Sequence, residues 1–161
     1  MTSEHEHFSA EGNGRPTAEG RFVDVSAIRS VEFVPGLEFR PVLGEDTMVN
    51  FVTFAPHTEA PRHVHKEEQI VIVLEGQFDF EIDGETRVMR TGDVAVIPSF
   101  VPHGAWTTES RCVEMDVFNP PRMTLLEHAR SERERAIAAL EATEGAGTTA
   151  VPPAQESNGG G

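Results

Sequence analysis

The stretch "PRHVHKEEQIVIVLEG", residues 61–76, places two histidines two positions apart and follows them with an apolar run and a glycine. In a β-strand, residues i and i+2 point to the same face. A strand here would direct the imidazoles of His63 and His65 toward one point, and imidazole is a ligand for Zn, Cu, Fe and Ni. Taken alone, this spacing favours two solvated histidines in a loop, so the surrounding sequence has to decide.

Short strand-like segments with turn signals between them surround this stretch. Phe78, Phe80 and Ile82 alternate with acidic residues, and Asp83-Gly84 is a strong hairpin signal. A second turn is expected at residues 91–93, where Thr, Gly and Asp follow one another. We expect strands at residues 47–54, 69–74, 78–82, 86–90, 94–97 and 113–118. Many short strands at regular spacing predict an all-β sandwich or small barrel.

The two ends of the chain differ from this middle region. Residues 1–20 and 143–161 are polar, rich in Gly, Ser, Glu and Pro, and without periodicity, so we expect a disordered N-terminal arm and a disordered tail. Residues 123–142 contain good helix formers and no Gly or Pro, which predicts a C-terminal helix. That helix would pack on the barrel, contact another subunit or be solvated. Residues 21–122 would then form the barrel.

Composition limits the partners and the location that we expect. The 161 residues carry a net charge of −14, which repels nucleic acid and anionic lipid, so the expected partner is a small-molecule substrate. The single cysteine, Cys112, excludes an internal disulfide and a cysteine-rich zinc site, and its surroundings predict a packed strand residue. With no apolar run of membrane-spanning length and no signal-peptide pattern, we expect a soluble cytoplasmic protein.

The opening stretch resembles the first motif of the cupin superfamily. That motif has a Gly, five residues, His-x-His, three or four residues, Glu, six residues and a Gly. His63, His65 and Gly76 match it, Gln69 stands in the position of the acidic ligand, and His57 stands where the first Gly is usual. Glu67 and Glu68 fall outside the ligand register, and we expect them to be a solvated pair on the turn. His57 is expected on an exposed loop.

A second stretch resembles the second cupin motif. Gly92 and Pro98 match, His103 falls in the ligand position, Phe100 replaces a Gly and Thr107 replaces an Asn. The resemblance covers about residues 44–118. It implies a jelly-roll barrel, also called a double-stranded β-helix, that holds one divalent metal ion per chain. The ion would be Zn, Fe, Mn or Ni, and its ligands would be His63, His65, Gln69 and His103. A neutral amide ligand would leave the ion its full charge and make it a stronger Lewis acid.

The segment "DVFNPPR", residues 116–122, follows the last predicted strand. Alternation places Asp116 and Phe118 on one face, and Pro120-Pro121 ends the strand before Arg122. On its own the pattern also fits an Asp that faces solvent and an ordinary surface Arg. With the "VPHGA" around His103, however, it resembles a branch of small cupins that convert 4,5-unsaturated monouronates to linear keto forms. The resemblance implies catalysis by Asp116 and Arg122, and substrate binding by Phe118 and Arg122.

Several functions remain open at this point. Cupin-type polyketide cyclases look similar over the same stretch but use a fourth His where this chain has Gln69. We expect a metal-dependent isomerase, cyclase or lyase that performs a non-redox ring opening, tautomerisation or cyclisation of a small oxygenated substrate. The alternatives are an Fe(II)-dependent oxygenase, a non-catalytic ligand or metal binder, and a cyanohydrin-cleaving lyase. Because sheet edges need cover and small cupins commonly pair, we also expect a homodimer.

Overall fold

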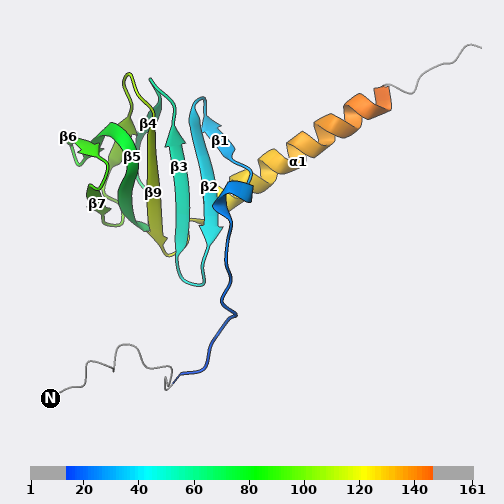
Figure 1. Ribbon diagram of the computed structural model, residues 1–161, viewed down its shortest axis with the longest axis horizontal. Coiled ribbons are helices and arrows are strands. Elements are labelled where there is room, and N and C mark those ends of the chain that lie inside the picture. Colours follow the sequence, from blue (N-terminus) through cyan, green and yellow to red (C-terminus); the bar gives the residue numbers. More distant parts are fainter. Residues whose placement is uncertain (1–13, 147–161) are drawn as a thin grey trace, which may run out of the picture.

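Antiparallel strands form the body of the molecule, which the computed structural model describes over residues 14–146 (Figure 1). The strands are β1 (Val31–Val34), β2 (Leu37–Leu43), β3 (Met48–Phe54), β4 (Glu59–His63), β5 (Glu68–Ile82), β6 (Glu85–Arg90), β7 (Val94–Ile97), β8 (His103–Trp106) and β9 (Cys112–Asn119). A 3-10 turn, Val25–Ala27, precedes β1, and an α-helix, α1 (Met123–Ala146), follows β9. The all-β prediction is confirmed.

The strands form two sheets that share β5. One sheet has the order β1-β2-β3-β9-β5-β7 and the other has the order β4-β8-β5-β6. The strand changes sheets at an irregularity between Val73 and Glu75 and at Gly76, whose φ is +80°. A Cβ at Gly76 would collide with the backbone oxygen of Arg111, so only glycine allows this approach. The two sheets curl into the nearly closed jelly-roll barrel that was expected (Figure 1).

The predicted strands are confirmed, and two of them are parts of one continuous strand. Five observed strands, β3, β6, β7, β9 and the long β5, cover all six predicted ranges, because residues 69–74 and 78–82 belong to one continuous strand. Asp83 and Gly84 both have positive φ values, 49° and 86°, as the predicted two-residue hairpin requires. The strands β1, β2, β4 and β8 were not predicted.

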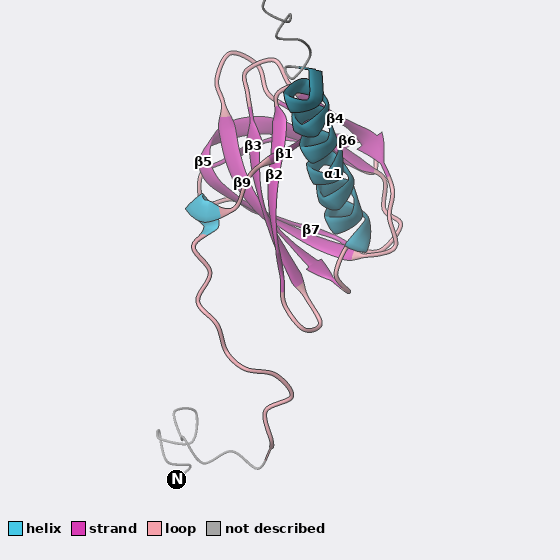
Figure 2. Ribbon diagram, turned by 90° about the vertical axis from the view of Figure 1, so that its right-hand side faces the viewer, coloured by secondary structure: helices cyan, strands magenta, loops and turns pink. Residues whose placement is uncertain are grey.

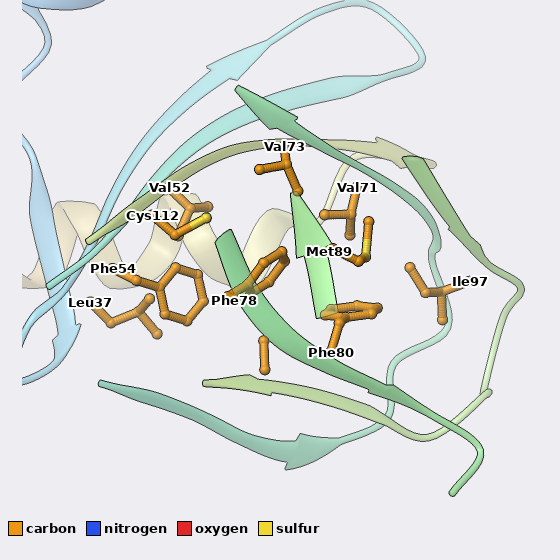
Figure 3. Close-up of a cluster of buried hydrophobic side chains, with 11 residues drawn as sticks. Leu37, Val52, Phe54, Val71, Val73, Phe78, Phe80, Met89, Ile97 and Cys112 are labelled. Carbon is orange, nitrogen blue, oxygen red and sulfur yellow. The ribbon is translucent and has the colours of Figure 1, made fainter. Parts of the chain in front are cut away.

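Alternate residues of these strands fill the barrel. In β3 and β9 every second side chain is buried, which is the pattern of a strand with one face toward a core. Figure 3 shows this core between the curved sheets. Its members are Leu37, Val52, Phe54, Val71, Val73, Phe78, Phe80, Met89, Ile97, Ala105 and Cys112.

Helix α1 begins at the predicted residue, Met123, and ends four residues beyond the predicted 142, at Ala146. Leu125 packs against Met48 and Phe118, and the ring of His128 lies 4.1 Å from that of Phe33, so the first turns are attached to the barrel. The remainder extends away from it (Figure 1), and in the view turned by 90° the helix lies in front of the strands (Figure 2). No helix in residues 14–146 has the length and apolar character of a membrane span.

The expected arm and tail fall mostly outside the described residues, at 1–13 and 147–161. Residues 14–20 contain no helix or strand.

Candidate active site

Three histidines meet near one end of the barrel. The ring nitrogens of His63, His65 and His103 that face one another all lie within 4.8 Å. His63 ends β4 and is the register partner of His103, the first residue of β8. Strand alternation had been expected to direct His65 toward the same point as His63. His65 lies beyond the end of β4, however, so alternation does not bring it there. The turn after β4 directs it there instead.

Backbone carbonyls hold all three imidazoles in one tautomer. Nδ1 of His63, His65 and His103 lies 2.8, 2.9 and 2.8 Å from the carbonyl oxygens of Pro61, Glu67 and Val101. Because a carbonyl oxygen can only accept a hydrogen bond, each Nδ1 carries the proton and donates. Each Nε2 therefore keeps a lone pair. This is the arrangement in which histidine binds metals.

The Gln69 side chain joins this cluster from β5. Its Oε1 lies 3.0 Å from Nε2 of His65 and 3.1 Å from Nε2 of His103. Its Nε2 donates to Oδ1 of Asp116 at 2.6 Å. Since a carboxylate oxygen accepts and the amide nitrogen donates, the Asp116 bond determines that the amide oxygen faces the histidines.

The donor set fits a divalent metal ion. With Nδ1 protonated, Nε2 of His65 and Nε2 of His103 are acceptors, and each lies about 3 Å from a third acceptor, Oε1 of Gln69. Such acceptors repel one another unless a cation lies among them. His63, His65, Gln69 and His103 are therefore the residues that would hold such an ion.

Burial keeps these imidazoles neutral. Burial is the largest cause that lowers the pKa of His103 to about 4; the hydrogen bond with the Val101 carbonyl acts in the opposite direction, and the neighbouring His63, His65 and Arg122 add to the lowering. Burial is also the largest cause that lowers the pKa values of His63 and His65. Neutral imidazole is the form that binds a metal, so the electrostatics agree with the tautomers.

Asp116 faces the inside of the barrel and is 5% exposed. Besides the bond from Gln69 it receives one from Asn50, its register partner on β3. Burial raises the pKa of Asp116 to about 7, although the hydrogen bond from Gln69, the charge of Arg122 and the bond from Asn50 act in the opposite direction. The expectation of an inward carboxyl beside the histidines is confirmed, and the solvent-facing alternative is wrong.

Arg122 reaches the same place from the segment after β9. Its guanidinium carbon lies 5.6 Å from the centre of the Phe118 ring, and that ring in turn lies 5.6 Å from the ring of His65. Phe118 itself is 1% exposed, and its buried ring packs against both Arg122 and His65. The structure thus brings together Asp116, Phe118, Arg122 and the four candidate ligands.

Glu67 and Glu68 do not form the solvated pair that was expected. Glu68 is exposed and begins β5. Glu67 is 6% exposed, and its Oε2 lies 3.6 Å from Nδ1 of His65. The tight turn that brings His65 inward also buries the next acidic side chain, which places a carboxylate behind the imidazole. His57, in contrast, is exposed, as expected, and lies 3.6 Å from Glu109.

A cavity of about 60 Å³ lies inside the barrel beside these residues. Its polar lining consists of His63, Gln69, His103, Glu114, Asp116 and Arg122. Sequence reasoning missed Glu114, although the alternation that turned Asp116 inward applies equally to a residue two positions earlier on the same strand. Asn50 was missed as well, because nothing in residues 47–54 distinguishes an inward Asn from its outward neighbours.

Comparison with known proteins agrees with this geometry. The family model "Cupin domain" matches residues 50–118. The chain is 34% identical over 83 residues to the pectin degradation protein KdgF of Dickeya dadantii, which covers 51% of this chain and 76% of that protein. This chain belongs to the cupin family. The fold expected from the two motifs is therefore confirmed by relatives as well as by the structure.

Two further matches are a solved structure and a protein that is named as an isomerase. The structure of KdgF from Halomonas sp. superposes with a TM-score of 0.63 at 29% identity and covers 66% of this chain and 99% of that one. The H2HPP isomerase of Bacillus subtilis is 36% identical over 74 residues, 45% of this chain. This cupin spans only 31% of that isomerase. At the level of the family, these relatives support an enzyme.

Proposed function

We propose that this cupin is a metal-dependent isomerase that converts a 4,5-unsaturated monouronate to its linear keto form. One observation carries the proposal: Asp116 is bonded to the amide of Gln69, and the same small cavity is lined by Arg122 and by two of the histidines. The likeness to two KdgF proteins, one of them named for pectin degradation, supports this class of substrate.

Arg122 is suited to hold the substrate carboxylate. A guanidinium presents two parallel N–H donors to a carboxylate, and Phe118 beneath it limits its movement. Arg122 follows directly after two prolines, whose rings stiffen the connection to β9. A uronate bound in this way would place its ring toward Asp116 and the histidines.

Asp116 is suited to move the proton. The reaction is an isomerisation in which the anomeric hydroxyl loses its proton, the bond from C1 to the ring oxygen breaks, and C4 gains a proton, so that an aldehyde and a ketone result. The net change transfers one proton from oxygen to carbon and requires no oxidant or reductant. A carboxyl group within reach of both positions can accept the first proton and deliver the second.

A bound divalent ion would act as a Lewis acid toward a substrate oxygen. The protein's own contribution is to present a neutral ligand set. Three neutral imidazoles and one amide add no negative charge. The carboxyl group of Asp116 lies behind this set and accepts a hydrogen bond from the amide nitrogen of Gln69.

The test is turnover of a purified 4,5-unsaturated monouronate by the metal-loaded protein. We expect loss of the ultraviolet absorption of the conjugated double bond and appearance of the linear keto product by NMR. Oxygen consumption in step with product would instead favour an oxygenase. An unchanged substrate at full metal loading would contradict the proposal.

Two variants separate the role of Asp116 in proton transfer from the role of Arg122 in binding the substrate carboxylate. Asp116→Asn is expected to lower kcat by about 10² to 10⁴, the range for loss of a general acid or base. Arg122→Ala is expected chiefly to raise KM, because it removes binding shared by the ground and transition states. Arg87→Ala, on the outside of β6, is a matched control and should change neither constant. Metal content should be equal in all of these variants.

A further inference from the structure

Glu114 is a buried carboxyl group that the proposed reaction does not use. It lies on β9 two residues before Asp116, is 4% exposed, and lines the same cavity. Its register partners are Val52 on β3 and Val73 on β5, so apolar side chains flank it on both sides. Its Oε2 is buried and has no hydrogen-bond partner among residues 14–146.

Such a group is costly for the fold. An unpartnered buried oxygen loses its hydration without compensation, and a buried carboxylate without a cation is more costly still. Burial and the neighbouring Asp116 raise the pKa of Glu114 well above its ordinary value, which favours the neutral acid. A valine or leucine would suit this layer of the barrel better. The cost therefore indicates that the carboxyl serves a ligand.

The position of Glu114 defines which part of a ligand it meets. Residues two apart on a strand are separated by about 6.7 Å, so Glu114 lies one layer deeper than Asp116. The cavity of about 60 Å³ extends from Glu114 to His63, His103 and Arg122. A hydroxyl or carbonyl substituent that enters the cavity to this depth would meet Glu114, while the rest of the molecule would lie nearer His63 and Arg122.

We propose that Glu114 is a specificity residue that hydrogen-bonds with a hydroxyl or carbonyl oxygen on the part of the substrate farthest from the histidines. As a neutral acid it donates through its O–H and accepts through its other oxygen, so it selects substrates with an oxygen at this position. An analogue without that oxygen would leave the carboxyl unpartnered and would be rejected. The identity of the substrate in this inference rests on the proposed function, whereas the position of Glu114 in the cavity does not.

The experiment compares Glu114→Leu, Glu114→Gln and a control, Glu75→Gln, which removes one charge from an exposed glutamate on β5. With the unsaturated monouronate as probe, kcat/KM should fall about tenfold to a hundredfold in Glu114→Leu, mainly through KM. Glu114→Gln keeps a donor and an acceptor and should stay within about threefold of the parent. Metal content should be unchanged throughout.

A melting curve decides whether Glu114 has a structural role instead. Glu114→Leu should melt at a higher temperature than the parent, because it replaces an unpartnered acid by an apolar side chain of similar size. A lower melting temperature in both Glu114 variants would show that the carboxyl holds the fold, through a buried water for example, and would overturn the inference. Unchanged kinetic constants in Glu114→Leu would overturn it as well. If the parent does not convert the monouronate, the proposed function fails, and a lower melting temperature in both Glu114 variants would overturn this inference independently.

Discussion

The Gln69 side chain is bonded to Asp116 at one end and faces two histidines with the other. A carboxylate in its place would have two equivalent oxygens and no proton to donate. It would therefore repel Asp116 at 2.6 Å and would add a negative charge to the candidate metal site. The amide avoids both effects, which explains why a glutamine is compatible with an acid directly behind the ligands.

Gln69→Glu should therefore retain the metal and lose activity. Carboxylate oxygen is also a metal ligand, but the added charge weakens the Lewis acid, and we expect kcat to fall at least about tenfold. Elemental analysis and turnover of the monouronate check the two parts. Gln77→Glu, an exposed change on the same strand, is the control. A Gln69→Glu variant as active as the parent would show that the neutral ligand has no catalytic purpose.

Cys112 should resist alkylation in the folded protein. It is 0% exposed, and burial is the largest cause that raises the pKa of its thiol from 9.0 to about 12. At pH 8 only about one thiol in 10⁴ would be ionised in the folded state, against about one in ten when unfolded. Mass spectrometry after iodoacetamide treatment, with and without guanidinium, tests this. Equal modification in both conditions would contradict it.

The same shift has a consequence for stability. The thiol pKa is raised on folding, so its contribution to the free energy of unfolding is fully present below about pH 9 and is lost as the pH rises toward 12.

The sequence predicted the residues of the site better than their surroundings. His63, His65, Gln69 and His103 could be recognised because their spacing follows the cupin motifs, and the alternation in "DVF" turned Asp116 inward. Glu67 could not be placed, because its burial depends on a turn that strand periodicity does not describe. The partners of each Nδ1 were equally inaccessible, since they are backbone carbonyls that exist only after the loops have formed.

Among the elements, two loops explain where this chain departs from the cupin motifs. His57 and Phe100 both stand where the motifs have glycine, and both have positive φ values, 56° and 64°. Glycine adopts this conformation freely, whereas other residues do so at a cost. The motif positions are therefore explained by backbone geometry. At Phe100 the backbone N–H donates to the carbonyl oxygen of His65 at 2.8 Å, which connects the loop before β8 to the turn after β4.

Replacing Phe100 by glycine should relieve this cost. The ring is 68% exposed, so its removal costs little packing. We expect Phe100→Gly to unfold with a free energy about 1 kcal/mol larger than that of Phe100→Ala, which removes the ring but keeps the Cβ. Urea denaturation of the two variants measures the difference. Equal stabilities would mean that the positive φ is not strained here.

The strands that were missed share a physical reason. β2 and β4 contain Pro41 and Pro61, which weaken a strand signal, and β1 and β4 are the end strands of their sheets. β8 has only four residues and includes Gly104. Such segments become strands because neighbouring strands supply hydrogen-bond partners. That information lies in the assembled sheet and not in the local sequence.

At the scale of the whole molecule, one outer face of the barrel is apolar. Two rows of half-exposed or exposed side chains cross β3, β9, β5 and β7 in register. The rows are Val49, Val117, Ile70 and Val96, and Phe51, Met115, Ile72 and Val94. A contiguous apolar face on a chain with a net charge of −14 is typical of a protein–protein interface.

We expect this face to pair with the same face of a second copy, which is the homodimer predicted from the sequence. Sedimentation at micromolar concentration should give twice the mass of one chain, and Met115→Lys should give a monomer, because it would bury a charge at the centre of the interface. Val88→Lys, an exposed change on β6 in the other sheet, should leave the dimer intact. A monomeric parent protein would contradict the expectation.

The long strand β5 belongs to both sheets, with Gln69 near its start and Ile82, the register partner of His103, at its end. The first sheet pairs with residues 68–76 of β5 and the second with residues 77–82, so the two sheets are joined through one continuous strand. The barrel should therefore have one cooperative unfolding unit and no half-formed intermediate that retains either sheet. Amide hydrogens in the middle of β5 should exchange with solvent only through global opening, and at the slowest rate in the molecule.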